Sequence, residues 1–204
     1  MKLYYAPGTC ALAPHIALEW AGQPYEVELA ELGSEDYLKI NPLGAVPALK
    51  DGDHKIMTQA DAILKYIETK HPNADLGVPK DPISQFELDE ALAFLSGDFH
   101  PAFWPFFVPD RFTLSNEKSA LKDVREAAFV RIDRAMSHLE TLLVKSTHVV
   151  GGKRTIADPY AFAMTRWSTH TPKPWQDYPA VKRFMEAMLD DAGVQNVMNA
   201  QGLK

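Results

Sequence analysis

Only one cysteine, Cys10, occurs among the 204 residues of the chain. A single thiol excludes an internal disulfide, and it leaves no second thiol for a Cys-x-x-Cys redox pair or a cysteine-based zinc cluster. The chain also lacks an apolar run of the roughly 20 residues that a transmembrane helix needs. Its first residues, MKLYYAPGTC, contain no apolar stretch of the kind that marks a secretion signal. We therefore expect a cytoplasmic protein with no metal site and no membrane partner.

Basic residues are also fewer than acidic ones. Lysine and arginine number 21 against 27 aspartate and glutamate residues, which gives a formal net charge of −6 at pH 7. Because nucleic acids and anionic membrane surfaces bind proteins through a basic face, neither is an expected partner. The hydrophobic fraction of 46% is ordinary for a globular protein, and the length suits one large domain or two small ones.

The hydrophobic pattern divides the chain into two parts. Up to residue 77, strand-like runs alternate with helical segments in the order β-α-β-α-β-β-α, with glycine and proline between them. The expected strands are residues 2–6, 24–32, 46–52 and 54–59, and the expected helices are residues 11–22, 34–41 and 60–71. The last two strands are predicted to form a hairpin that turns at Asp51 and Gly52, because Asp-Gly is a strong hairpin signal.

From residue 84 onward, apolar residues recur at helical spacing. The predicted helices are residues 84–100, 115–145, 156–170, 178–190 and 193–200. Residues 73–83 contain a glycine and two prolines, which is typical of a linker. We therefore expect an α/β N-terminal domain of residues 1–77 and an all-helical domain of residues 84–204, joined by residues 78–83.

Cys10 lies at the junction of the first strand and the first helix. A proline is accommodated only in the first turn of a helix, so Pro14 places the helix start near Ala11 and Cys10 just before it. The unpaired N–H groups and the dipole at a helix N-terminus favour an anion, which lowers the pKa of a thiol and makes it reactive. The other interpretation is a small buried hydrophobic residue, which is a common role of a free cysteine.

A proline also begins the third predicted strand. If the Val46-Pro47 peptide bond is cis, the N–H and C=O groups of Val46 turn out of the sheet and can pair with an extended, peptide-like ligand. An ordinary trans proline at the head of a strand is the alternative.

The segment LSGDFHPAFWPFF predicts a bend or break in the first helix of the second part, because Pro101 and Pro105 cannot donate helical hydrogen bonds. A bent helix opens a cleft, and His100 at the bend titrates near neutral pH. Burial of this histidine and its aromatic neighbours in the core is the alternative. Farther along, Thr155 and Asp158 predict a capping box in which each side chain accepts the other's backbone N–H, and we assign both to folding.

Together these stretches resemble the cytosolic glutathione transferases, specifically their bacterial beta class. The similarity runs nearly from end to end and rests on KLYYAPGTCALAPHIAL, NPLGAVPAL, MTQADAILKYI, ELDEALAFLSGDFHPAFWPFF, RTIADPYAFAMTRW and AQGLK. The resemblance implies a thioredoxin-like N-terminal domain, an all-helical C-terminal domain, and a homodimer with the active site between the domains. It also implies glutathione as co-substrate and a role in detoxification.

The resemblance assigns roles to individual residues. It places Cys10 against the sulfur of glutathione and pairs the backbone of Val46 with the cysteinyl part of the tripeptide. Gln59 and Ala60 correspond to residues that bind the γ-glutamyl end. His100 corresponds to a histidine near the thiol, which makes Cys10 and His100 the implied catalytic pair. The segment beside this histidine is implied to line the glutathione site: Gly97, Asp98 and Phe99.

Three departures from the family pattern concern glutathione binding. Ala60 lacks the hydroxyl group usual at its position, although its backbone N–H can still bind a carboxylate. Ala93 stands where asparagine is common, and no lysine follows Leu32 where one often binds the glycyl carboxylate. Each lost hydrogen bond weakens binding by about 0.5–1.5 kcal/mol.

The predicted function is conjugation of the glutathione thiolate to small hydrophobic electrophiles that lie near Phe103, Trp104 and Phe107. Cys10 holds the sulfur, and His100 tunes its charge or moves a proton. Two alternatives stay open. A glutathione-dependent monothiol peroxidase or thiol-disulfide reductase would use Cys10 as its redox group, because a lone thiol needs an external thiol to resolve its oxidised form. The other alternative is a non-catalytic binding protein on the same scaffold.

Overall fold

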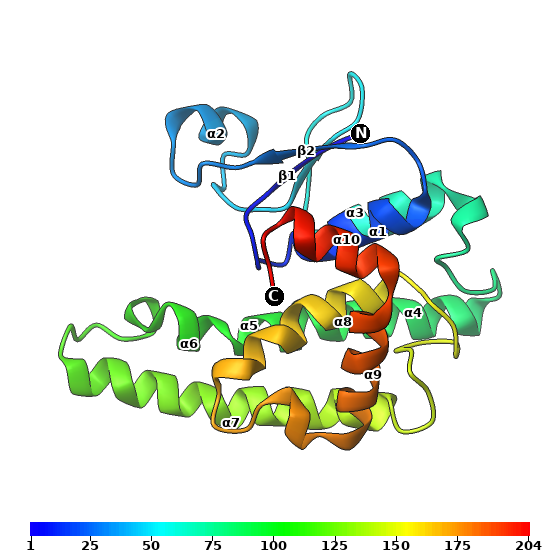
Figure 1. Ribbon diagram of the computed structural model, residues 1–204. Helices are drawn as coiled ribbons and strands as arrows, with labels where there is room; N and C mark the ends of the chain where they lie inside the picture. The colour runs from blue at the N-terminus through cyan, green and yellow to red at the C-terminus, as the bar shows by residue number, and fades with distance from the viewer.

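The computed structural model describes residues 1–204, and the first part of the chain forms a small mixed sheet with helices packed on it (Figure 1). The elements are β1 (Lys2–Tyr5), α1 (Leu12–Ala21), β2 (Glu26–Leu29), α2 (Glu35–Ile40), β3 (Ala48–Lys50), β4 (Met57–Thr58) and α3 (Ala60–Lys70). This order is the predicted one. The strands lie in the order β2-β1-β3-β4, with β1 parallel to β2 and antiparallel to β3. β3 and β4 form the predicted hairpin, although residues 51–56 connect them rather than a two-residue turn.

Side chains of the sheet alternate between its two faces, as the pleat of a strand requires. Leu3 of β1 and Leu49 of β3 are fully buried in the main core, which also contains the apolar residues of α1 and α3. Tyr4 and Ala48 lie on the opposite face, where they pack with Tyr37 of α2. One face of the sheet therefore packs on α1 and α3, and α2 contacts part of the other face, while every residue of β2 stays exposed.

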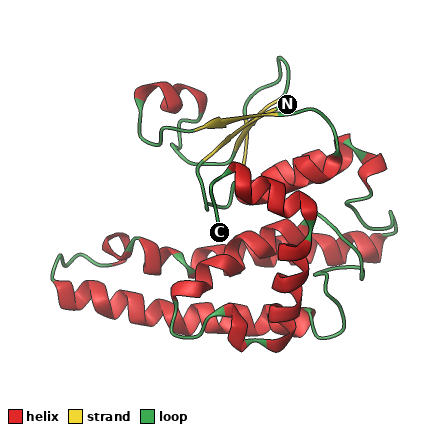
Figure 2. Cartoon of the chain, viewed as in Figure 1, coloured by secondary structure: helices red, strands yellow, loops and turns green.

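The second part of the chain contains helices and no strand, as predicted (Figure 2). Its longer helices are α4 (Pro82–Phe94), α7 (Lys118–Leu142), α8 (Ala157–Thr165), α9 (Pro179–Asp190) and α10 (Ala192–Ala200). Two short helices follow α4, namely α5 (His100–Ala102) and α6 (Trp104–Phe107). Short 3₁₀ turns cover Pro72–Ala74, Pro109–Phe112, Arg166–His170 and Trp175–Asp177.

The predicted bend near Pro101 is confirmed, and it begins earlier than the proline. α-Helical hydrogen bonding ends at Phe94 and is followed by a π-helical turn, Leu95–Phe99, which the His100 N–H closes by donating to the Leu95 carbonyl. Pro101 has no N–H to donate, so a regular α-helix cannot continue through this point. The π-helical turn, α5 and α6 therefore replace the end of the predicted helix.

Helix α1 connects the two parts of the chain. Eight of its 10 residues are buried, because it packs on α3 in the first part and on α8 and α10 in the second. Every residue of α8 is buried as well. A helix enclosed on all sides is apolar all round, which accounts for the sequence LAPHIAL at the start of α1.

Asp158, in the first turn of α8, is a fully buried carboxylate. It accepts hydrogen bonds from the Thr155 N–H at 2.7 Å and from the Val149 N–H at 2.8 Å. The other half of the predicted capping box is wrong. The Thr155 hydroxyl oxygen accepts from the Ala157 N–H, and the Asp158 N–H donates to the Thr155 carbonyl oxygen instead. Asp158 therefore fixes the loop before α8 as well as the start of the helix.

The C-terminal residues hold the turn that carries Cys10. The side-chain oxygen of Gln201 accepts from the Gly8 N–H at 3.3 Å, and its amide nitrogen donates to Nδ1 of His15 at 3.0 Å. The indole N–H of Trp167 donates to the Gly8 carbonyl oxygen at 2.8 Å. Gly8 has a φ of +71°, in the left-handed region that favours glycine. Both backbone polar groups of Gly8 are therefore bonded to the helical part of the chain.

Replacing Asp158 by alanine leaves the N–H groups of Val149 and Thr155 without acceptors. An unsatisfied buried group costs about 1–3 kcal/mol, so we expect Asp158→Ala to lower the free energy of unfolding by about 2–5 kcal/mol. Urea denaturation followed by circular dichroism measures this loss. Asp53, in an exposed loop, provides the control, because Asp53→Ala should change stability by less than about 0.5 kcal/mol. Equal stability of the two variants would contradict the role of Asp158.

Replacing Gln201 by alanine removes the acceptor of the Gly8 N–H and should loosen the turn that carries Cys10. A buried thiol reacts with iodoacetamide when the turn opens, and lowering the opening free energy by about 1.4 kcal/mol raises the alkylation rate about tenfold. Mass spectrometry of the native protein over time measures this rate. Gln195, exposed on α10 with a side chain that donates to the Leu189 carbonyl, is the matched control. If Cys10 were alkylated at the same rate in Gln201→Ala and Gln195→Ala, the Gln201 side chain would not hold the turn.

Candidate active site

A cavity of about 770 Å³ lies between the sheet and the helical part. The turn before α1, the loop before β3 and the start of α3 line one side of it, and residues of the π-helical turn, α6 and α8 line the other. Five of the residues predicted for the site meet in its wall: Cys10, Val46, Gln59, Ala60 and His100.

Cys10 lies in the turn immediately before α1, as predicted, but its side chain is only 8% exposed. Its thiol donates a hydrogen bond of 3.4 Å to the carbonyl oxygen of Val46. Burial raises the pKa of the Cys10 thiol to about 12, and the lowering by its own backbone N–H is smaller. The predicted lowering of this pKa is therefore wrong for the unliganded chain, because loss of water outweighs the helix N-terminus. At neutral pH Cys10 is an S–H donor and not a thiolate.

The Val46-Pro47 peptide bond is cis, which confirms the first of the two alternatives for this proline. The preceding loop is fixed at the Ala45 carbonyl oxygen, which accepts from the Tyr37 hydroxyl at 2.8 Å and from the Asn41 side-chain amide at 2.6 Å. Val46 thus lines the cavity in a fixed loop, with its carbonyl oxygen bonded to the thiol.

Gln59 and Ala60 lie where α3 begins, at one end of the cavity. Gln59 has a φ of +72°, a conformation that side-chain-bearing residues rarely adopt and that costs about 1–3 kcal/mol. The first N–H groups of α3, a helix of 11 residues, have no partner within the helix, so this end favours an anionic group. Asp61 is the one carboxylate in the cavity lining, and Arg111 is the one arginine or lysine. Sequence reasoning identified neither of these charged residues.

His100 faces the cavity from the end of the π-helical turn. Its Nδ1 lies 3.1 Å from the hydroxyl oxygen of Tyr160. Its ring packs against those of Trp104 and Trp167, at centroid distances of 5.9 and 5.1 Å. Burial among these rings lowers the pKa of His100 to about 4. The expectation that His100 titrates near neutral pH is therefore wrong, and its imidazole is neutral at pH 7.

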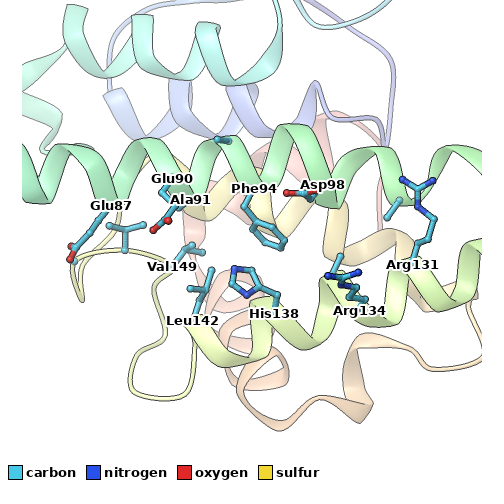
Figure 3. A pocket seen from close by; sticks show the side chains of 15 residues that line it. Glu87, Glu90, Ala91, Phe94, Asp98, Arg131, Arg134, His138, Leu142 and Val149 are labelled. Carbon is cyan, nitrogen blue, oxygen red and sulfur yellow. The ribbon is translucent and has the colours of Figure 1, made fainter.

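Contrary to the prediction, Gly97, Asp98 and Phe99 do not line this cavity. Of the π-helical turn, only Ser96 joins His100 in the lining. Phe99 is fully buried among phenylalanine rings of the core. Gly97 is exposed outside the cavity, and Asp98 lines a second groove, which is shown in Figure 3. Residues four apart in a helix share a face, which is why Ser96 and His100 meet the cavity and the three residues between them do not.

Two of the three predicted aromatic residues form part of the cavity wall. Trp104 and Phe107 line it, whereas Phe103 is fully buried in the core. Trp167 also lines the wall, with its ring centroid 5.3 Å from that of Phe107. Sequence reasoning missed the roles of Trp167 and Tyr160, because the apolar pattern of α8 and the turn after it does not separate a residue that borders a cavity from one inside the core.

The second groove has a volume of about 990 Å³ and lies between α4 and α7. Glu87 and Glu90 of α4 lie toward one end of the view in Figure 3, and Arg131 and Arg134 of α7 lie toward the other. The ion pairs of these two helices involve other residues. The groove therefore has two carboxylates without an ion pair at one end, and two guanidinium groups beside the Asp98 carboxylate at the other.

No group of three or more histidine, cysteine, aspartate and glutamate side chains is arranged to hold a metal ion. None of the helices combines the length and the apolar character needed to span a bilayer.

Comparisons with known proteins show the family of the chain. The sequence model of the glutathione S-transferase N-terminal domain matches residues 3–75, and that of the C-terminal domain matches residues 98–191. A curated relative, glutathione S-transferase GST-4.5 of Xanthomonas campestris pv. campestris, is 35% identical over 206 residues, with 100% of both chains covered.

Solved structures match over the whole chain as well. The bacterial beta-class glutathione S-transferase of Sphingomonas chungbukensis has a TM-score of 0.88 at 30% identity, with 100% of both chains covered. A sphingomonad glutathione S-transferase complexed with glutathione has a TM-score of 0.86 at 30% identity, again with 100% of both chains covered. The chain therefore belongs to the glutathione S-transferase family, and its structural likeness is to the bacterial beta class.

Proposed function

We propose that the protein conjugates the thiolate of glutathione to small hydrophobic electrophiles, and that it does so in the cytoplasm. The observation that carries this proposal is the meeting of Cys10, Val46 and His100 in one cavity that also has an aromatic wall. A tripeptide thiol and an apolar electrophile fit the two sides of such a cavity. Holding them at reacting distance lowers the barrier of a step that is otherwise bimolecular.

Glutathione is expected to lie extended between the start of α3 and the turn that carries Cys10. Its γ-glutamyl carboxylate would accept from the Ala60 N–H beside Gln59, and its cysteinyl backbone would pair with that of Val46. The glutathione bound to the sphingomonad relative supports this choice of ligand. Because Ala60 has no hydroxyl group, the γ-glutamyl carboxylate should bind more weakly but at the same place.

Arg111 can supply the positive charge for which the sequence offers no lysine. It is the only arginine or lysine side chain in the cavity lining, and it lies in the 3₁₀ turn that follows α6. Glutathione carries two carboxylates, of which one is expected at the start of α3. We assign Arg111 to the glycyl carboxylate, because a guanidinium group and a carboxylate form strong paired hydrogen bonds.

In the proposed reaction, the glutathione thiol loses its proton to water, and the sulfur forms a bond to an electrophilic carbon. The leaving group departs with the electron pair of its bond. When glutathione binds, the S–H group of Cys10 turns from the Val46 carbonyl oxygen and donates its hydrogen bond to the thiolate instead, which stabilises the negative charge in surroundings that otherwise disfavour it. A pKa of about 12 suits Cys10 to this role, since it stays protonated beside the reacting sulfur.

The same pKa bears on the redox alternative. Reduction of a peroxide or disulfide at Cys10 requires the thiolate, because the thiolate is the attacking species. Because burial raises the pKa of Cys10, its thiol is protonated at neutral pH in the unliganded chain, which supports conjugation over a redox role for this residue.

Calorimetric titration with glutathione, followed by an assay with 1-chloro-2,4-dinitrobenzene, tests the proposed function. We expect binding, conjugation, and a loss of kcat/KM of about tenfold or more in Cys10→Ala, since a hydrogen bond to a charged group contributes about 1.5–3 kcal/mol. Cys10→Ser keeps a donor and is the matched control, which should retain more activity than Cys10→Ala.

Other outcomes of this experiment identify the alternatives. Glutathione binding without conjugation would indicate a binding protein. Reduction of peroxide or mixed disulfide at a higher rate than conjugation would indicate the redox enzyme. If Cys10→Ala left conjugation unchanged, the role assigned to this thiol would be wrong.

We also propose that two copies of the chain associate through α4 and α7. Ile83, Phe86 and Val130 on these helices are 68%, 60% and 74% exposed, which leaves apolar surface in water. On α4, Ile83 and Phe86 lie four residues before Glu87 and Glu90, respectively, so these side chains share one face of the helix. A two-fold axis can set the acidic end of one groove against the basic end of its partner, so the surface is self-complementary.

Light scattering after gel filtration tests the dimer, whose expected mass is twice the 22.8 kDa of the chain. Reversing both arginines, Arg131→Glu with Arg134→Glu, should give monomers, because acidic ends then face each other. Mixing this variant with Glu87→Lys, Glu90→Lys should restore a dimer of the two variants. Arg125→Glu, exposed on α7 outside the groove, is the control. A native monomer, or a dimer indifferent to charge reversal, would contradict this interface.

A further inference from the structure

Tyr160 lines the cavity, and neither the sequence nor the resemblance assigned a role to it. It belongs to α8, is 2% exposed, and places its hydroxyl oxygen 3.1 Å from Nδ1 of His100. The two rings meet edge-on, with centroids 6.1 Å apart and an interplanar angle of 88°. Both residues line the cavity.

The hydrogen atoms of this pair can be assigned from the partners available. Nδ1 of His100 is the hydrogen-bond partner that the Tyr160 hydroxyl has within the chain. Burial raises the pKa of the phenol and lowers that of the imidazole, so both groups are neutral at pH 7. A neutral imidazole has its proton on one nitrogen only. If that nitrogen were Nδ1, the buried hydroxyl hydrogen would have no acceptor, so the favourable arrangement has the hydroxyl donating to Nδ1.

The imidazole proton then lies on Nε2, since the bond at one nitrogen sets the protonation of the other. Nε2 makes no hydrogen bond within the chain and is not one of the fully enclosed polar atoms. It is therefore the nitrogen that His100 offers to the cavity. The rings of Trp104 and Trp167, at 5.9 and 5.1 Å, pack against the imidazole and restrict its rotation.

We propose that Tyr160 is a positioning residue, which holds His100 in the tautomer whose Nε2–H points at the sulfur of bound glutathione. This inference rests on the proposed function and extends it from the identity of the groups to the positions of their protons. The sulfur then receives two hydrogen bonds, one from Cys10 and one from His100, and each is strengthened by its negative charge. Neither donor gives up its proton, and the proton of the glutathione thiol leaves to water.

The free protein tests the tautomer without any ligand. In nitrogen NMR of isotope-labelled native protein, Nδ1 of His100 should have the shift of an unprotonated nitrogen and Nε2 that of a protonated one. Tyr160→Phe should populate both tautomers. Tyr178→Phe is the matched control, because Tyr178 is also buried and donates its hydroxyl to Asp133, away from His100. A proton on Nδ1 in the native protein, or an unchanged tautomer in Tyr160→Phe, would overturn the proposal.

The glutathione complex tests the consequence for the sulfur. The ultraviolet absorbance of the thiolate, followed against pH, gives the apparent pKa of the bound glutathione thiol. Tyr160→Phe should raise this pKa by about one unit and lower kcat about tenfold, with KM for glutathione within about twofold. The same substitution in a His100→Ala background should cause no further loss. Tyr178→Phe should lower thermal stability and leave the pH profile unchanged.

The outcomes separate this inference from the proposed function. An unchanged pH profile in Tyr160→Phe, with conjugation intact in the native protein, would overturn the inference alone. Absence of glutathione binding by the native protein would overturn the proposed function, and the contact between His100 and the sulfur would fall with it. The NMR measurement on the free protein would then still show whether Tyr160 sets the tautomer.

Discussion

The enclosure of α1 by both parts of the chain is the constraint on which the site depends. The turn at its N-terminus carries Cys10, and Gly8 in that turn is bonded to Trp167 and Gln201 of the helical part. The sheet, α1 and the C-terminal tail are therefore coupled through one short segment of backbone. Because Trp167 also packs against His100, the same contacts set the distance between the thiol and the histidine. These contacts join two segments far apart in the sequence into one wall of the cavity.

Burial, more than local backbone geometry, decides the protonation of the groups in this wall. A thiol at a helix N-terminus is stabilised as an anion, but an anion that has lost its water is destabilised more strongly. Burial favours the neutral form of both groups, so it raises the pKa of Cys10 and lowers that of His100. The unliganded cavity is therefore lined by neutral donors. Its charged groups, Asp61 and Arg111, are the two that sequence reasoning did not find.

The order of elements and the place of Cys10 could be predicted because both depend on local chemistry. Gly22 caps α1 in the left-handed conformation with a φ of +65°, and Pro14 lies in the first turn, as their residue types require. The exposure of Cys10 and the burial of Phe103 could not be predicted in the same way. They depend on which face of each helix meets the other part of the chain, and periodicity alone does not determine that face. The family resemblance supplied Cys10, Val46 and His100, but it gave no role to Tyr160.

The π-helical turn at Leu95–Phe99 has an effect on every residue that follows it. A residue in an α-helix advances by about 100° around the axis, so the wider turn rotates the following side chains relative to those of α4. Ser96, His100 and Trp104 follow one another at intervals of four residues across this turn and line one wall of the cavity. The selection of residues that meet a ligand is thus set by the number of residues between α4 and α6. A point substitution here alters one contact, whereas an insertion or deletion would exchange the whole set.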